Sequence, residues 1–206
     1  MKAGLQRPDP LLVLASGSVA RQRLLQAAGL QFEAFPASVD EGLIKQSARA
    51  EGAAIQEAAL LVAEFKAKRV GLRFPEALII GADQILDCQG AWFDKPGSLA
   101  EARAQLHALR SKTHQLATAV VCVQGGSRIW HQVVSPRLTM RRFSEDFLEA
   151  YIAAEAEFLV QSVGAYRIEG LGLQLFSEVE GDASAIQGLP LLALLGFLRQ
   201  YGVLLE

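Results

Sequence analysis

Apolar and polar positions along the 206-residue chain follow two periodicities, one typical of buried strands and one typical of amphipathic helices. Short continuous apolar runs at residues 11–15 and 77–81 predict buried strands, and residues 32–37 predict another. Helical spacing and capping residues predict helices over residues 19–28, 48–72, 99–109, 144–154 and 189–201. Strands and helices therefore alternate along most of the chain.

Turn residues divide the remaining segments into strands. Residues 85–93 are typical of a hairpin, Gly125-Gly126 joins two predicted strands at residues 113–123 and 128–140, and residues 173–179 alternate like a further strand. Crossovers together with hairpins predict an α/β fold with a mixed, twisted sheet flanked by helices. We expect one domain over residues 1–206 with two lobes on one sheet, its first ten residues being peripheral.

Composition narrows the class of protein. Hydrophobic residues make up 51% and charged residues 20%, which excludes general disorder. The net charge of −2 argues against a nucleic acid polymer or an acidic membrane as partner, although a small anionic ligand still fits. Two cysteines cannot form a disulfide framework, and no apolar run is long enough to span a bilayer. We expect a reduced, cytoplasmic protein without a membrane partner.

A turn of small residues between the first strand and the first helix is a candidate phosphate site. Ser16 and Ser18 supply hydroxyl groups, the helix start supplies free N–H groups, and the guanidinium of Arg21 can bind two oxygens. Ser and Gly at such turns are more often simple helix caps. Both interpretations, a phosphate site and a simple helix cap, stay open from the residues alone.

Three charged positions follow further along the chain. Asp83 stands at the end of the apolar run 77–81, where it could hold a divalent cation or activate water, or only cap a turn. Lys95, beside Pro96, could reach a phosphate but is more simply a surface lysine. Glu41 closes an acidic pair that is a metal candidate or plain loop charge, and Lys66 lies in a helix where lysine is usually solvated.

The order of these motifs resembles that of the Maf family of nucleoside triphosphate pyrophosphatases, from about residue 12 to residue 202. The matching segments, in chain order, are Leu14-Ala-Ser-Gly-Ser-Val-Ala-Arg21, Val39-Asp-Glu41, Ala63-Glu-Phe-Lys66-Ala67, Ile80-Gly-Ala-Asp83, Asp94-Lys-Pro96, Ser111-Lys-Thr-His114, Gly164-Ala-Tyr166, Glu180-Gly-Asp182 and Gly188-Leu-Pro190. The resemblance implies two lobes with a central cleft, similar to inosine triphosphatases.

The family hydrolyses a nucleoside triphosphate to the monophosphate and pyrophosphate with a divalent cation, Mg²⁺ or Mn²⁺. By resemblance, Asp83 is the catalytic residue and shares the cation with Glu41. The residues expected to bind the phosphates are Ser16, Ser18, Arg21, Lys66 and Lys95. The partner is then a small nucleotide, and the resemblance also suggests a homodimer.

Three positions bear on base preference. Gln84 and Glu169 look more like the branch acting on 7-methyl-GTP than the branch acting on dTTP and UTP. A carboxylate at position 169 could accept the N–H donors of guanine and suits a cationic methylated ring. Ala20 stands where the family often has Arg or an aromatic residue, and Val19 replaces the usual proline.

Three alternatives accompany the expected 7-methyl-GTP pyrophosphatase. The first is a pyrophosphatase for dTTP, UTP or other modified nucleotides. The second is a nucleotide-binding regulator of septum formation without strong catalysis. The third is an inactive scaffold or interaction protein of the same fold. Pyrophosphate release from a panel of triphosphates separates them.

Overall fold

A computed structural model describes residues 5–206, which divide into two compact units. The first unit runs to residue 83 and also contains residues 118–134 and 188–206, whereas the second contains residues 84–117 and 135–187. Strands β3 (Leu78–Cys88) and β5 (Thr113–Gln124) each contribute residues to both units. Each unit is described below by itself.

The first unit packs helices on both faces of its strands. Besides its parts of β3 and β5, it contains β1 (Leu12–Leu14), α1 (Val19–Ala27), β2 (Glu33–Ala34), α2 (Glu41–Ala50), α3 (Ile55–Gly71), β6 (Ser127–Val134) and α7 (Leu191–Gln200). β1 pairs in parallel with β2 and β3, and β5 pairs antiparallel with β6. Parallel and antiparallel pairs together confirm the predicted mixed sheet.

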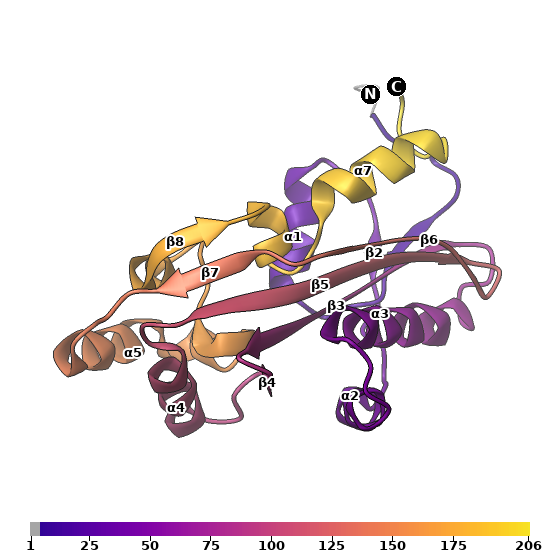
Figure 1. Cartoon of the computed structure of the whole chain (residues 1–206). Coiled ribbons are helices and arrows are strands. Elements are labelled where there is room, and N and C mark those ends of the chain that lie inside the picture. Colours follow the sequence, from indigo (N-terminus) through magenta and orange to yellow (C-terminus); the bar gives the residue numbers. More distant parts are fainter. Residues whose placement is uncertain (1–4) are drawn as a thin grey trace. The chain divides into compact units, whose positions relative to one another are not determined.

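Alternation along the strands sends successive side chains of the first unit to opposite faces. On one face Leu14, Ile80 and Val120 form a core with Leu25 of α1 and Leu198 of α7. The other face meets α3, and Figure 1 shows α3 on the side of the strands away from α1 and α7. The apolar runs that predicted strands are therefore buried on both sides, as parallel strands require.

The close approach of α3 depends on Gly81 in β3. A Cβ at Gly81 would lie 2.2 Å from the carbonyl oxygen of Ala63 and 2.8 Å from the Cβ of Ala67. Because no side chain fits this gap, the backbone of α3 rests directly on the strand. The approach fixes which residues of α3 can reach β3.

The second unit has its own apolar core. Besides its parts of β3 and β5, it contains β4 (Ala91–Phe93), α4 (Leu99–Leu109), β7 (Arg137–Met140), α5 (Glu145–Leu159), η1 (Val163–Ala165), η2 (Leu171–Leu175), β8 (Phe176–Glu180) and α6 (Ala183–Ile186). β7 pairs antiparallel with β5 and β8. The core joins Leu106 of α4, Leu148 of α5 and Leu138 of β7.

The helix predicted over residues 48–72 is wrong in extent. It is two helices, α2 and α3, separated by a turn at Gly52, whose φ of +76° suits glycine. The supposed acidic loop before it is the start of α2, where Asp40 caps the helix by accepting a hydrogen bond from Leu43 N at 2.9 Å.

Three predicted strands also differ from the structure. Residues 128–140 are two strands, β6 and β7, interrupted at Pro136, because proline has no N–H for a ladder. Residues 173–179 begin in the 3₁₀ turn η2 and become β8 only at Phe176. β3 continues to Cys88, so Asp83 lies inside a strand rather than at its end. Within residues 5–206, no helix is long and apolar enough to cross a membrane.

Gly81→Ala is expected to lower the free energy of unfolding by about 3 kcal/mol or more, because the added methyl group meets the backbone of Ala63. Urea unfolding measures the change. The matched control is Gly196→Ala in α7, where a Cβ has open space. Because alanine favours the helix more than glycine does, this control should raise the free energy of unfolding by about 0.5–1 kcal/mol. Equal stability of Gly81→Ala and the wild type would contradict the close packing.

Candidate active site

A buried lysine between two carboxylates is the centre of the site. Lys66 Nζ lies 2.7 Å from Asp83 Oδ1 and 2.8 Å from Glu41 Oε1, and the lysine side chain is only 8% exposed. A buried ammonium group is tolerated only when opposite charges compensate it. We call Lys66, Asp83 and Glu41 the ion cluster.

Three elements of the first unit deliver these side chains. Lys66 lies on the buried face of α3 with Ala63 and Ala67, the residues that touch Gly81. Asp83 is two residues beyond Gly81, so its side chain leaves β3 on the same face, toward α3. β1 ends at Leu14, opposite Ile80, so Asp83 lies past the carboxyl end of its neighbouring strand. Ligands of parallel α/β sheets bind at such ends.

Glu41 is the first residue of α2, where the helix dipole favours a negative charge. Burial raises the pKa of Glu41, but the ammonium group of Lys66 outweighs this effect, helped by Lys45 and Arg21. The net result is a pKa below its ordinary value. Glu41 is therefore held as a carboxylate facing Lys66.

Arg21 is buried and fixed on two sides. Its Nε donates to the carbonyl oxygen of Gly188 at 2.8 Å, and its Nη1 donates to Ser16 Oγ at 3.1 Å. Burial lowers the pKa of Arg21, while the negative charges of Asp83 and Glu41 oppose that shift. The guanidinium group is thus an oriented cation in the field of the two carboxylates.

The serine turn has a structural use that the sequence predicted. Ser18 caps α1, because its Oγ accepts a hydrogen bond from Arg21 N at 3.5 Å. Ser16 Oγ accepts from Ser18 N at 3.2 Å, in addition to its bond with Arg21. Ala20 is half-buried in the first turn of α1. The serine turn and the guanidinium group of Arg21 therefore form one hydrogen-bonded network.

One buried oxygen of the ion cluster lacks a hydrogen-bond partner among residues 5–206. Asp83 Oδ1 binds Lys66, but Asp83 Oδ2 is buried and has no hydrogen bond within this part of the chain. An unsatisfied carboxylate oxygen is costly, which indicates a ligand of positive or hydrogen-donating character. Carboxylate oxygens suit Mg²⁺ or Mn²⁺, which also take phosphate and water oxygens. Across residues 5–206 no three His, Cys, Asp or Glu side chains form a metal cluster. That Glu41 and Asp83 hold a cation stays a prediction.

The remaining predicted residues belong to the second unit. Lys95 is exposed after β4, and Glu169 is exposed in a turn before η2. Gln84 Nε2 donates to the carbonyl oxygens of Ala185 at 3.0 Å and Ile186 at 3.1 Å. The structure thus brings Ser16, Ser18, Arg21, Glu41, Lys66 and Asp83 together within the first unit. That Lys95, Gln84 and Glu169 join them stays a prediction.

Two contributors to the site were not predicted. The carbonyl group of Gly188 orients Arg21, and Gly81 lets α3 approach Asp83. Gly188 has a φ of +103°, and a Cβ there would lie 3.4 Å from Arg21 Nε. The Gly-Leu-Pro motif at Gly188 was the available signal, but a backbone carbonyl leaves no residue type to identify it.

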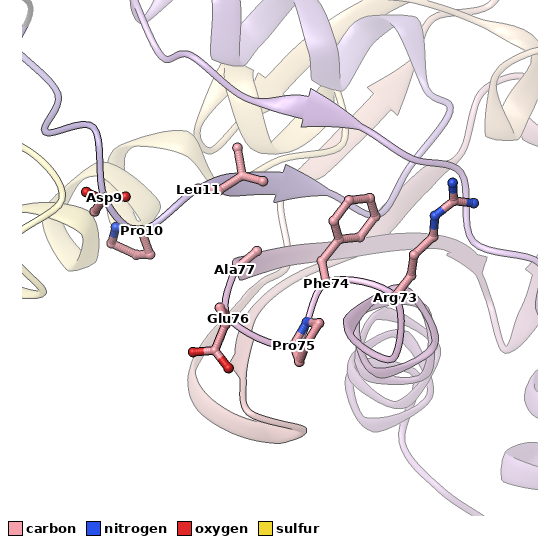
Figure 2. Close-up of a pocket in the computed structure, with 8 residues that line it drawn as sticks. All are labelled: Asp9, Pro10, Leu11, Arg73, Phe74, Pro75, Glu76 and Ala77. Atoms are coloured by element: carbon pink, nitrogen blue, oxygen red, sulfur yellow. The ribbon is translucent and has the colours of Figure 1, made fainter.

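A pocket of about 620 Å³ opens elsewhere on the first unit. Figure 2 shows its lining, with Leu11 before β1 and Ala77 before β3, and with Phe74 and Arg73 beside them. Both strands enter the sheet here, so the pocket lies at the end opposite Asp83. None of the predicted site residues lines it.

Comparison with known proteins agrees with the geometry. The model of a family described as Maf-like protein matches residues 11–201. A nucleoside triphosphate pyrophosphatase of Granulibacter bethesdensis is 55% identical, covering 94% of this chain and 98% of that protein. One of Rhodospirillum rubrum is 52% identical, covering 96% and 98%. A 7-methyl-GTP pyrophosphatase of Rhizobium etli is 43% identical, covering 95% and 98%. These relatives match both units.

Glu41→Gln is expected to destabilise the protein in a pH-dependent way. Because the folded-state pKa of Glu41 is lowered, its stabilisation is full above the ordinary value of 4.5 and is lost as the pH falls below it. The difference in free energy of unfolding between wild type and Glu41→Gln should therefore shrink as the pH is lowered below 4.5. Chemical denaturation at neutral pH and at a series of acid pH values measures the difference.

The control introduces Glu41→Gln into a protein that already carries Lys66→Met. Without the ammonium group, the main cause of the lowered pKa of Glu41 is gone. In this background Glu41→Gln should no longer reduce the free energy of unfolding at neutral pH. A difference between wild type and Glu41→Gln that stays constant from neutral to acid pH would show that Lys66 does not hold this carboxylate.

Proposed function

Because the chain belongs to the Maf family, whose relatives at about half identity are nucleoside triphosphate pyrophosphatases, we propose that it hydrolyses 7-methyl-GTP to the monophosphate and pyrophosphate. The enzyme class is a hydrolase acting on acid anhydrides. The observation that carries the proposed chemistry is the ion cluster: a buried Lys66 fixing Asp83 while Asp83 Oδ2 stays without a hydrogen bond.

Asp83 is the proposed catalytic base. Lys66 holds Oδ1, so Oδ2 is the oxygen that can accept a proton from water. The water oxygen bonds to the α-phosphorus, the bond from that phosphorus to the bridging oxygen breaks, and pyrophosphate leaves with the electron pair. A fixed and desolvated carboxylate needs no reorganisation as the proton moves, which lowers the barrier.

Cations of the first unit supply the charge compensation. Lys66 and Arg21 lie beside the two carboxylates and can neutralise negative charge that develops on the phosphates. The start of α1 adds N–H groups next to Ser16 and Ser18. A divalent cation, held by Glu41 and Asp83, supplies Lewis-acid neutralisation of the triphosphate when bound. Lys95 is proposed as a further phosphate ligand from the second unit.

The preference for 7-methyl-GTP is the finer part of the proposal. It is supported by Gln84 and Glu169 and by the Rhizobium etli relative, named a 7-methyl-GTP pyrophosphatase. The exposed carboxylate of Glu169 can accept the N–H donors of guanine and attract the positive charge of its methylated ring. Ala20 leaves room where a larger residue could contact another base. The homodimer and the cytoplasmic location stay predictions from the sequence.

Asp83→Asn is expected to reduce kcat for 7-methyl-GTP by about 10³-fold, because the amide cannot accept the proton of water. Pyrophosphate release with Mg²⁺ or Mn²⁺ measures the rate. Asp87→Asn is the matched control, since Asp87 lies in the same strand but outside the ion cluster, and it should keep the wild-type rate. Undiminished turnover by Asp83→Asn would remove the base from the mechanism, and no turnover of any triphosphate by wild type would favour the regulator.

Glu169→Gln is expected to reduce the preference for 7-methyl-GTP over UTP by about tenfold in kcat/KM, because it removes one charge-assisted hydrogen bond. The ranking of GTP, dTTP, UTP and 7-methyl-GTP is compared between wild type and variant. Glu178→Gln on β8 removes an exposed carboxylate of the same unit and serves as control. An unchanged ranking would show that Glu169 does not read the base.

A further inference from the structure

One glutamine of the second unit joins two loops that carry proposed substrate residues. Gln105, on α4, donates from Nε2 to the carbonyl oxygen of Asp94 at 2.8 Å. Its Oε1 accepts from Gly164 N at 3.2 Å. Asp94 directly precedes Lys95, the proposed phosphate ligand, and Gly164 opens the segment that leads to Glu169. The side-chain amide of Gln105 therefore uses both its donor and its acceptor, and each binds the backbone of a different loop.

The loop around Lys95 is fixed to α4 at both ends. Before Lys95, the Asp94 carbonyl group binds Gln105. After it, Gly97 N donates to Glu101 Oε2 at 2.8 Å, and Ser98 caps the helix. Pro96 lies between these contacts and has no N–H to donate. The Lys95 backbone is thus positioned by residues of α4 and its cap.

The segment that leads to Glu169 is strained and clamped. Ala165 has a φ of +56°, and an alanine in this left-handed conformation persists only where neighbours hold it, whereas the φ of +78° at Gly164 suits glycine. Besides Gln105, Tyr151 donates its hydroxyl to Ala165 O at 3.2 Å. The ring of His114 shares a hydrogen bond with Tyr166 at 2.7 Å. The Gln105 bond is the contact that also reaches the other loop.

Arg167, two residues before Glu169, is also held by side-chain contacts. Arg167 donates to both carboxylate oxygens of Glu155, at 2.7 Å and 3.2 Å, and its guanidinium lies over the ring of Phe158. Glu155 is buried and Arg167 is partly buried, so the bidentate pair lies at the edge of the core. Residues 164–167 are therefore anchored one after another, and a hydrogen bond from Gly170 N to Arg167 O at 3.3 Å closes the turn that contains Glu169.

We propose that Gln105 is a positioning residue that couples the two loops, so that phosphate binding through Lys95 and base discrimination through Glu169 depend on one amide. The inference rests on the proposed function of those two residues. Only a side chain with a donor and an acceptor can serve both loops, and among residues of this shape only glutamine has both. The coupling lies wholly within the second unit.

Two variants of similar shape separate the two bonds. Gln105→Glu keeps an acceptor for Gly164 N but loses the donor to Asp94, and Gln105→Met loses both. We expect Gln105→Glu to raise KM about fivefold for every triphosphate while the base ranking is kept. Gln105→Met should raise KM similarly and also reduce the preference for 7-methyl-GTP about fivefold. The kcat for 7-methyl-GTP should stay within about twofold in both variants.

Hydrogen exchange of the free enzyme tests the coupling without turnover. The amide of Gly164 should exchange at least about tenfold faster in Gln105→Met and at the wild-type rate in Gln105→Glu. Gln174→Met replaces an exposed glutamine of η2 and should change neither exchange nor kinetics. Melting temperatures show whether each variant is folded. If Gln105→Met does not fold, the KM and base ranking of Gln105→Glu test the proposal instead.

The proposal is overturned if Gly164 exchange is the same in Gln105→Met and wild type. It is also overturned if an active wild type and Gln105→Met share the same KM and base ranking. A wild type that hydrolyses no triphosphate refutes the proposed function instead, and the exchange rates still decide whether Gln105 holds the Gly164 segment. The two failures are therefore distinguishable.

Discussion

The compensation of a buried ammonium group is the constraint on which the first unit depends. Lys66 has lost nearly all its water, and Asp83 and Glu41 replace it at hydrogen-bond distance. Removing one carboxylate would leave the ammonium group of Lys66 with a single charged partner, whereas removing Lys66 would leave two carboxylates facing each other. Helix packing at Gly81, the start of α2 and the position of Asp83 inside β3 are all consistent with this one requirement.

Local chemistry explains which parts of the fold could be predicted. The helix at residues 99–109 and the cap at Ser18 follow from neighbouring residues, and the structure confirms both. The break at Gly52 was missed because alanine-rich sequence on either side continues the helical pattern. The interruption at Pro136 was missed because β-branched residues around it suggest one long strand.

Only part of the site could be predicted from the amino-acid sequence. Lys66 and Asp83 are 17 positions apart, and each alone had an ordinary structural explanation. The order of motifs suggested that they belong to one site, and the structure places them in direct contact. Backbone groups such as the Gly188 carbonyl, and the unsatisfied Oδ2 of Asp83, cannot be read from residue types because they depend on the folded path of the chain.

The bond between Arg21 and Gly188 spans 167 positions, and this has a consequence for the order of synthesis. Residues 84–117 and 135–187, the whole second unit, leave the ribosome before Gly188 does. The first unit begins earlier but lacks α7 and the acceptor for Arg21 until its last segment emerges. Since domains fold as units during translation, the part of the chain made first is completed last. A nascent chain therefore contains Arg21 through most of its synthesis without the carbonyl group of Gly188 that orients its guanidinium group.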